Sequence, residues 1–533
     1  MWLGWAMDEA LEKHEVEVEY RAISPSEFFY KNRDIAGFSS PARSLYMSIR
    51  ELVENSLDGA EAGRILPEIL VELSQEKMDD EESDVRVYRL RVEDNGIGVA
   101  GDKIPMAFAT VLYGSKYGYR QSRGTFGLGG TMALLYGQIT TNRPATVISS
   151  NDGKTIYKYE LMIDVVENKP RIISSEKIKN VRGWHGTIVD FYLEADYTTS
   201  RSKIIEYFRD TAIANPHATL TFVDSRGRLY HFPRSVDKVP EPPKETKPHP
   251  VGVDVETMSR LLSTTSARNL ATFFMSSFQK VGRKTALDII QTAGLKPNMD
   301  PRKLTHDQLT TLVDAVKKYG KFRPPDPSPL SPLGAEFLRA GIRSLLNPHF
   351  LHVVEREPSS YSGHPFIVEA AIAYGGLIQP SESIQLYRFA NKIPLLYDER
   401  ADVAWKVVSE RIDWSNYKVP KPAPLAVFTS ICSTKIPYKT VGKEAIADRP
   451  EIERELTIAV RECARNLKAY LSRIEKREAS EKRLGIYAKY LPKIAEFSAT
   501  AAGLKRPPDV RALLKKLGVT KEILEAEKTA EKS

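Results

Sequence analysis

The 533-residue sequence has only two cysteines, Cys432 and Cys463, and no long apolar run. Two thiols exclude a disulfide framework or an all-cysteine metal site, so we expect both to be ordinary buried side chains. A bilayer-spanning helix takes about 20 apolar residues in a row, and no segment approaches this length. The apolar start MWLGWAMDEA lacks the basic residues and the cleavage site of a signal peptide. These absences predict a cytoplasmic protein with no membrane contact.

The composition is otherwise that of a globular protein, with 42% hydrophobic and 27% charged residues. At about 150 residues per domain, the length predicts three or four domains. The net charge of +8 and the isoelectric point near 9.0 suit a polyanionic partner such as nucleic acid. A merely basic soluble protein explains the same charge equally well, so charge alone does not decide.

Two stretches rich in proline and charge, residues 231–252 and 321–334, divide the chain. Before the first, helical and strand-like patterns alternate, which predicts an α/β domain with a mixed sheet. The predicted helix covers residues 40–63, and the predicted strands cover 65–73, 85–94 and 187–195. Between the two stretches, amphipathic patterns predict a small all-helical domain. These patterns cover residues 254–263, 267–278, 283–294 and 305–320.

Beyond the second stretch, strand-like runs at 364–376 and 424–434 precede a long helical pattern from Glu451. Its apolar residues recur at intervals of three and four and form one stripe: Ile452, Leu456, Val460, Cys463, Leu467, Leu471 and Ile474. This predicts a third, α/β domain that ends in a long helix. The last stretch, from about Glu475, is basic and partly helical, and its end should fray. The chain is therefore predicted to be an α+β multidomain protein.

The first candidate for chemistry lies in the helix predicted at 40–63. On a helical wheel, Glu51, Asn55 and Asp58 cluster opposite an apolar face. That face comprises Leu45, Ile49, Leu52, Val53 and Ala60. Such a cluster is usually a solvated polar face, and alone the pattern favours this interpretation. The functional alternative is that Asn55 offers an oxygen to Mg²⁺ while Glu51 orients and deprotonates a water.

The second candidate is VEDNGIGVAG, which ends at Gly101 and matches the G-x-G-x-x-G fingerprint of dinucleotide-binding sites. That fingerprint needs an apolar strand running directly into the glycines and a helix directly after them. Here polar residues precede the glycines, and we expect Pro105 to delay any helix. Asp94, at a strand end, can instead accept a hydrogen bond from the exocyclic amine of adenine. Gly96 and Gly98 would let the backbone approach the base, and Gly101 would be incidental.

The third candidate is the glycine-rich RGTFGLGGT, residues 123–131, followed by the helix-like MALLYGQ. A glycine-rich loop that enters a helix offers backbone N–H groups and a positive dipole end to phosphates. A flexible turn explains the same residues equally well. The sequence has no G-x-x-x-x-G-K-[ST], which excludes a P-loop.

Together, the order and spacing of E-x-x-x-N, D-x-G-x-G and a glycine-rich lid resemble the Bergerat (GHKL) ATP-binding fold. This α/β sandwich is shared by gyrase-type topoisomerases, MutL repair proteins, a class of heat-shock chaperones and sensor histidine kinases. HGTIVDF, at 185–191, resembles its fourth element, in which Thr187 would lie near the adenine-side aspartate and its water. The resemblance implies that the chain binds ATP and Mg²⁺.

Further stretches narrow the resemblance to the B subunits of topoisomerase VI, a type IIB DNA topoisomerase. They are SPSEFFYKN, RELVENSLDGAE, TAIANPHA, KPHPVGVDVETM, GHPFIVEAAIAYGG, RFANKIPLLYD and CSTKIPYKTVGKEAIAD, and they extend from Ser24 to Asp448. The family's organisation implies an N-terminal strap and ATPase domain at 1–235 and a helix-two-turns-helix domain at 245–322. It also implies a ribosomal S5-like transducer domain with a long helix at 323–483, followed by a basic, partly helical tail at 484–533.

The resemblance also implies the site residues. Glu51 would be the general base, Asn55 the Mg²⁺ ligand and Asp94 the adenine contact. In the family a transducer lysine contacts the γ-phosphate, and its place in VGKE assigns this role to Lys443, with Lys435 in STK as the alternative. The other nucleotide contacts would be Gly96, Gly98, Ser115, Lys116, Gly124, Thr125, Phe126, Gly127, Leu128, Gly129, Gly130, Thr131 and Thr187. At the positions of Gly130 and Thr131, relatives carry other residues, in some a lysine.

The implied activity is that of the ATP-driven gate of a type II topoisomerase. ATP would bring two ATPase domains together, aided by exchange of the N-terminal segment, and hydrolysis would release this self-dimer. Two such chains would join two A subunits, which cut DNA, in an A2B2 heterotetramer. The assembly would pass one DNA duplex through another in the nucleoid, relaxing supercoils and decatenating DNA.

Other ATPases of the same superfamily are the alternatives. A heat-shock chaperone would lack the helical insert, and a histidine kinase would need a phosphoacceptor histidine on a helical hairpin. His14 precedes the ATP motifs, but it lies in a strand-like alternation. A MutL-like repair clamp resembles the sequence more than these two do, yet the helical insert and the KPHPVGVDVET stretch argue against it.

Overall fold

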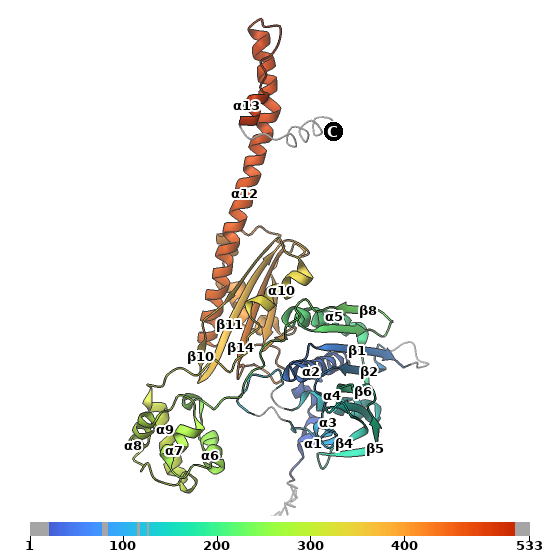
Figure 1. Ribbon diagram of the computed structural model, residues 1–533, viewed down its shortest axis with the longest axis vertical. Coiled ribbons are helices and arrows are strands. Elements are labelled where there is room, and N and C mark those ends of the chain that lie inside the picture. Colours follow the sequence, from blue (N-terminus) through green and yellow to red (C-terminus); the bar gives the residue numbers. More distant parts are fainter. Residues whose placement is uncertain (1–20, 77–83, 115–117, 125–126, 517–533) are drawn as a thin grey trace, which may run out of the picture.

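The computed structural model describes residues 21–76, 84–114, 118–124 and 127–516. Its elements form an N-terminal α/β part, a small helical part and a second α/β part from which a long helix projects (Figure 1). Each part has a hydrophobic core of its own. No helix among the described residues is both long and apolar enough to cross a membrane. The predicted strap exchange and the fraying end fall on residues 1–20 and 517–533, outside the described residues.

The N-terminal part is built on an eight-stranded sheet in the order β5-β4-β3-β6-β2-β1-β7-β8. Its strands are β1 (Glu68–Gln75), β2 (Arg86–Asp94), β3 (Ala145–Ser150), β4 (Thr155–Asp164), β5 (Lys169–Lys179), β6 (Gly186–Ala195), β7 (Thr219–Val223) and β8 (Leu229–Phe232). β1 and β7 pair in parallel, whereas the other neighbours are antiparallel. The sheet is mixed, as the sequence predicts.

Five α-helices accompany this sheet among the described residues. They are α1 (Pro25–Lys31), α2 (Pro41–Ala62), α3 (Ile104–Ala109), α4 (Gly129–Thr141) and α5 (Tyr197–Ala214), with a 3₁₀ turn at Arg33–Ala36. The Ser40 side chain accepts from the Arg43 N–H and caps α2, whose first turn holds Pro41. α2 and α4 both pack on β6, and α5 packs against α2.

α2 is buried on nearly all sides, so its polar side is not a solvated face. The Glu51 residue is only 7% exposed, and Asp58 forms an ion pair with Arg123. Asn55, between them, is exposed. The wheel separates polar from apolar residues on one helix, but it does not show what packs on the polar side.

Two expectations about the VEDNGIGVAG region are wrong. α3 begins at Ile104 with Pro105 in its first turn, where proline is tolerated because the N–H groups there have no intrahelical acceptor. Gly101 is not incidental, since a Cβ there would overlap the ring of Tyr157 on β4. A dinucleotide site remains excluded, because β2 lies between antiparallel neighbours and that site belongs to a parallel sheet.

The helical part contains the helices that the amphipathic patterns predict. They are α6 (Val255–Thr264), α7 (Leu270–Ser277), α8 (Arg283–Thr292) and α9 (His306–Tyr319), with 3₁₀ turns at Pro250–Gly252 and Pro301–Lys303. Its core is rich in phenylalanine and includes Phe273, Phe274 and Leu312. α9 begins with a reciprocal capping box between Thr305 and Gln308.

The second α/β part has a six-stranded sheet in the order β10-β11-β14-β12-β13, with β9 paired to β11. Its strands are β9 (Phe350–Glu355), β10 (Ser359–Tyr361), β11 (His364–Tyr374), β12 (Gln385–Ala390), β13 (Ile393–Pro394) and β14 (Leu425–Ser433). Its shorter helices are α10 (Ala335–Leu346) and α11 (Val403–Lys406), with a π turn at Val407–Arg411 and 3₁₀ turns at Glu399–Ala401 and Trp414–Tyr417.

Both faces of this sheet are covered. Along β11, Ala370 and Ile372 belong to a core shared with the long helix α12 (Pro450–Ala501), whereas Ala371 and Ala373 belong to a core shared with α10. Successive strand residues point to opposite faces, so the two helices lie on opposite sides of the sheet. The α10 core also includes Ile213 and Ala214 of α5, which joins the two α/β parts by apolar packing.

α12 extends away from the rest of the molecule (Figure 1). Its expected apolar stripe is buried from Ile452 to Leu471, and Ile474 is half-buried. The helix continues past Arg483 to Ala501 before the short α13 (Arg511–Lys516) packs back on it. Cys432 and Cys463 are both buried free thiols, as expected.

Candidate functional site

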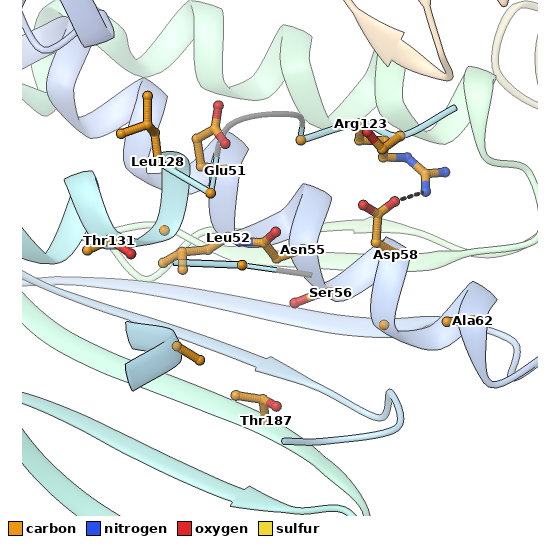
Figure 2. A pocket seen from close by; sticks show the side chains of 18 of the residues that line it. Glu51, Leu52, Asn55, Ser56, Asp58, Ala62, Arg123, Leu128, Thr131 and Thr187 are labelled. Atoms are coloured by element: carbon orange, nitrogen blue, oxygen red, sulfur yellow. Dashed lines mark hydrogen bonds and ion pairs between the residues drawn. The ribbon is translucent and has the colours of Figure 1, made fainter. Parts of the chain in front are cut away.

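A cavity of about 710 Å³ lies between the two α/β parts. α2, the end of β2, the glycine-rich loop before α4 and the start of β6 line it (Figure 2), together with two loops of the second part. The predicted residues on its wall are Glu51, Asn55, Asp94, Gly98, Gly124, Gly127, Leu128, Gly129, Gly130, Thr131, Thr187 and Lys443. Gly96, also predicted, is buried and is not among the residues that line the cavity. Four others, Ser115, Lys116, Thr125 and Phe126, lie outside the described residues.

Asp94 ends β2 at the floor of the cavity, where three donors hold its carboxylate. Ser56 Oγ donates to Oδ2 at 2.8 Å, and the N–H groups of Gly96 and Thr187 donate to Oδ1 at 2.9 and 3.1 Å. Burial raises the pKa of Asp94, and these donors oppose the rise. A fixed, partly desolvated carboxylate is suited to accept a hydrogen bond from an amino group.

Close packing of the backbone explains the glycines beside Asp94. Gly98 has a φ of +66°, and a Cβ on it would overlap the carbonyl oxygen of Ser150. The Thr187 hydroxyl lies 3.1 Å from Ser149 Oγ, which also donates to the Gly186 carbonyl. β2, β3 and β6 are therefore joined at this end of the sheet, which fixes the cavity floor.

Glu51 faces the start of α4. A Cβ on Gly129, the first residue of that helix, would overlap the Glu51 carboxylate. The next residue is also close to α2, because a Cβ on Gly130 would lie 3.2 Å from Asn55 Nδ2. The positive end of the α4 dipole and its first-turn N–H groups thus lie beside Glu51, an arrangement suited to polyphosphate.

Lys443, from a loop of the second α/β part, reaches the same place. Its Nζ lies 3.6 Å from Glu51 Oε1 and 3.9 Å from Glu54 Oε2, and it donates to the Arg123 carbonyl at 3.1 Å. The Lys443 residue is only 5% exposed. Lys435 is exposed and does not line the cavity. Geometry therefore favours Lys443 over Lys435 as the lysine that meets a bound phosphate.

The donors around the cavity fit a magnesium ion carried by a polyphosphate. The described residues contain no group of three or more His, Cys, Asp or Glu side chains that could hold a metal ion. Mg²⁺ is often bound by one or two protein oxygens, with phosphate oxygens and waters as its other ligands. Asn55, exposed on the cavity wall, offers one such oxygen.

A cluster of buried charges that the sequence patterns did not predict lies at the base of the glycine-rich loop. Arg123 pairs with Asp58 at 2.7 Å (Figure 2) and with Glu61 at 2.6 Å. His217 Nε2 and Lys392 Nζ lie 3.0 and 3.7 Å from the same Glu61 carboxylate. Burial opposes the charge of Glu61, yet these neighbours hold its pKa well below the usual range.

The cluster also ties the second part to the loop. Asn391, next to Lys392, donates to the Ser122 carbonyl at 3.1 Å, and both lysine and asparagine line the cavity. Lys392 Nζ lies 3.0 Å from Ser331 Oγ as well. These contacts join residues far apart in the sequence, so no local pattern reveals them. The one local indication of this cluster is that its arginine, Arg123, is the first residue of the glycine-rich stretch RGTFGLGGT.

Two protein-family models match the chain. Residues 41–162 match the model of the histidine kinase-, DNA gyrase B- and HSP90-like ATPase. Residues 325–483 match the model of the topoisomerase VI B subunit transducer. A solved structure, the MutL ATPase domain of Aquifex aeolicus with ADP, aligns with 72% of this chain and 89% of its own at 12% identity, with a TM-score of 0.31.

Relatives named as B subunits of type 2 DNA topoisomerase 6 match nearly the whole chain. The relative from Metallosphaera sedula is 45% identical over 480 residues, which cover 90% of this chain and 89% of the relative. The relative from Sulfurisphaera tokodaii is 44% identical with the same coverage. With identity at this level over this length, the chain belongs to the family of type 2 DNA topoisomerase 6 B subunits.

Proposed function

We propose that the chain is the ATP-binding and ATP-hydrolysing subunit of an ATP-dependent type II DNA topoisomerase, in which it acts as the gate for DNA. The observation that carries the proposal is the contact of Lys443 with Glu51, whose charged atoms lie 3.6 Å apart across the junction of the two α/β parts. A transducer cation beside the general base of the ATPase part makes the junction sensitive to the nucleotide. Membership of the topoisomerase family favours this function over a repair clamp or a chaperone.

ATP binding uses the two ends of the cavity. Asp94 accepts from the adenine amino group at the floor of the cavity, beside Gly98, which also lines it. The phosphates lie at the start of α4, where Gly124, Gly127, Leu128 and Gly129 supply backbone donors. Two further lid residues, Gly130 and Thr131, also line the cavity, and we retain both as phosphate neighbours.

Glu51 orients the attacking water and takes its proton as the water oxygen bonds to the γ-phosphorus and the bond to ADP breaks. Asn55 would hold Mg²⁺, which would neutralise part of the phosphate charge. Lys443 Nζ, next to Glu51, meets the γ-phosphate and loses this partner after hydrolysis. Because Lys443 belongs to the second part, the loss changes how the two parts are held together.

Membership of the family supports a proposal for the assembly. ATP brings two chains together through their ATPase parts. Two A subunits complete an A2B2 heterotetramer. They supply the DNA-cleaving group, so this chain has no nuclease activity of its own. The complex acts on double-stranded DNA of the nucleoid, passing one duplex through a break in another to relax supercoils and decatenate DNA.

The test measures ATP hydrolysis and supercoil relaxation by the wild type and Glu51→Ala, with and without the purified A subunit. We expect relaxation only with both subunits and ATP, and a loss of hydrolysis by Glu51→Ala of about 10²- to 10⁴-fold. ADP affinity should remain within about threefold, because Glu51 lies at the phosphate end. Relaxation by this chain alone, or normal hydrolysis by Glu51→Ala, would contradict the proposal.

A further inference from the structure

The loop that carries Lys443 has a conformation that requires support. Lys443 has a φ of +56°, in the left-handed region that non-glycine residues seldom adopt. The Lys443 N–H donates to the Thr440 carbonyl, and Lys439 N–H donates to the Ala445 carbonyl, which closes the loop. A strained turn of this kind persists where its surroundings hold it.

The support comes from Arg50 on α2, in the other α/β part. A single nitrogen, Arg50 Nη1, donates to the Gly442 carbonyl at 3.0 Å and to Glu444 Oε1 at 3.3 Å. These two acceptors are the residues on either side of Lys443. Arg50 is fully buried, and both contacts cross the junction between the parts. One guanidinium therefore binds the residue before Lys443 and the residue after it.

Glu54, one turn further along α2, fixes the guanidinium. Arg50 Nε donates to Glu54 Oε1 at 2.8 Å. The other oxygen, Glu54 Oε2, is buried, has no hydrogen-bond partner and lies 3.9 Å from Lys443 Nζ. Burial raises the pKa of Glu54, while Arg50 and Lys443 oppose the rise. The same carboxylate thus holds Arg50 and faces the lysine amine.

Arg50 also stands next to Glu51 in the sequence. The two residues lie on one rigid helix, with Glu51 directed to the cavity and Arg50 to the loop. The position of the general base and the position of the loop that carries Lys443 are therefore set by neighbouring residues of α2.

We propose that Arg50, fixed by Glu54, is a positioning residue that holds the Gly442–Glu444 backbone so that the Lys443 amine meets the phosphate beside Glu51. The inference rests on the proposed function, in which Lys443 contacts the γ-phosphate. Arg50 does not touch the nucleotide, and it acts through Lys443. If the second part moves relative to α2, both contacts of Arg50 have to break. These contacts therefore favour two distinct arrangements of the parts, one with the contacts formed and one with them broken.

The test is a double-mutant cycle in the complex with the A subunit, combining Arg50→Lys with Lys443→Met. Lysine keeps the buried charge but cannot reproduce the fixed geometry of a guanidinium. Alone, Arg50→Lys should lower kcat for ATP hydrolysis about 10- to 100-fold, with ADP affinity changed less than about twofold. In the Lys443→Met background, the same change should lower kcat by less than about twofold more, because its effect passes through the lysine.

Equal losses in both backgrounds would overturn the proposal, as would an unchanged kcat or a loss confined to ADP affinity. If Arg50→Lys does not fold, Glu444→Gln replaces it in the same cycle, since it weakens the contacts of the Glu444 carboxylate with Arg50 and Arg43 without changing a residue of α2. Lys435→Met, an exposed residue before the same loop, is the matched control and should hydrolyse ATP normally. Failure of the proposed function is recognised separately, because the wild-type complex would then not couple hydrolysis to relaxation.

Discussion

The junction between the two α/β parts differs sharply from the attachment of the helical part. At the first junction, buried charges meet across the boundary: Lys443 with Glu51, Arg50 with Glu444 and Lys392 with Glu61. Apolar packing accompanies them, because α5 residues share a core with α10 and β11. The core of the helical part, in contrast, consists of residues between Val253 and Phe322 of that part.

This difference indicates that the two α/β parts move in a coupled way, whereas the helical part is only attached to them. Buried ion pairs are strongly disfavoured when one partner is lost, so they hold a junction in discrete arrangements. The helical part follows the proline-rich segment at 231–252 and precedes the one at 321–334. The segment at 231–252 also touches the chain before the glycine-rich loop, where Tyr119 pairs with Thr246. We infer that nucleotide state passes to the second α/β part and that the helical part keeps its own stability.

The largest effect on stability should come from opening the core of the helical part. Leu312→Ala removes a fully buried side chain of α9 and should cost the helical part about 2–5 kcal/mol. Calorimetry should show an earlier melting transition for this part, while ADP binding by the ATPase part is unchanged. If Leu312→Ala also abolished ADP binding, the helical part and the ATPase part would have to unfold as one unit.

The next effect distinguishes two lysines near the same loop. Lys443→Met should lower ATP hydrolysis about 10²-fold, because it removes a buried cation from the phosphate end of the cavity. Lys435→Met should change hydrolysis less than about twofold, since Lys435 is exposed and outside the cavity. Steady-state hydrolysis by the A-subunit complex measures both. The reverse ranking would assign the contact to Lys435.

A third expected effect is a pH dependence on α5, which packs against the second part. Burial raises the pKa of Asp210 to about 7 from an ordinary value of 3.8. The folded state therefore holds a proton that the unfolded state releases, and stability falls as pH rises from about 4 to 7, by at most about 1.4 kcal/mol per pH unit. Asp210→Asn should flatten this slope in urea titrations at several pH values. An unchanged slope would assign it to another group.

Local patterns in the sequence predicted the elements well. Periodicity located α2, the helices of the helical part and the apolar stripe of α12, because each depends on neighbouring residues. It failed at Gly101, where packing against Tyr157 decides, and at Pro105, which lies in the first turn of α3 and does not delay the helix.

The candidate site shows the same division. Spacing identified Glu51, Asp94 and the glycine-rich loop, each of which lines the cavity. The partners of Arg50 and Arg123 were not predictable, since Gly442 and Glu61 meet them only after the chain folds. Lys443 came from family resemblance, because nothing in its neighbours indicates that its amine is buried against Glu51.

The most direct test of the account measures the distance between the two α/β parts. Labels at Lys154→Cys, in the β3–β4 turn, and Lys468→Cys, on α12, occupy exposed sites, and both native thiols are buried. In the complex with the A subunit, we expect a non-hydrolysable ATP analogue and ADP to give different label distances in the wild type and the same distance in Lys443→Met. A Lys443→Met protein that retains the full wild-type difference would contradict the claim that this lysine transmits the state of the nucleotide.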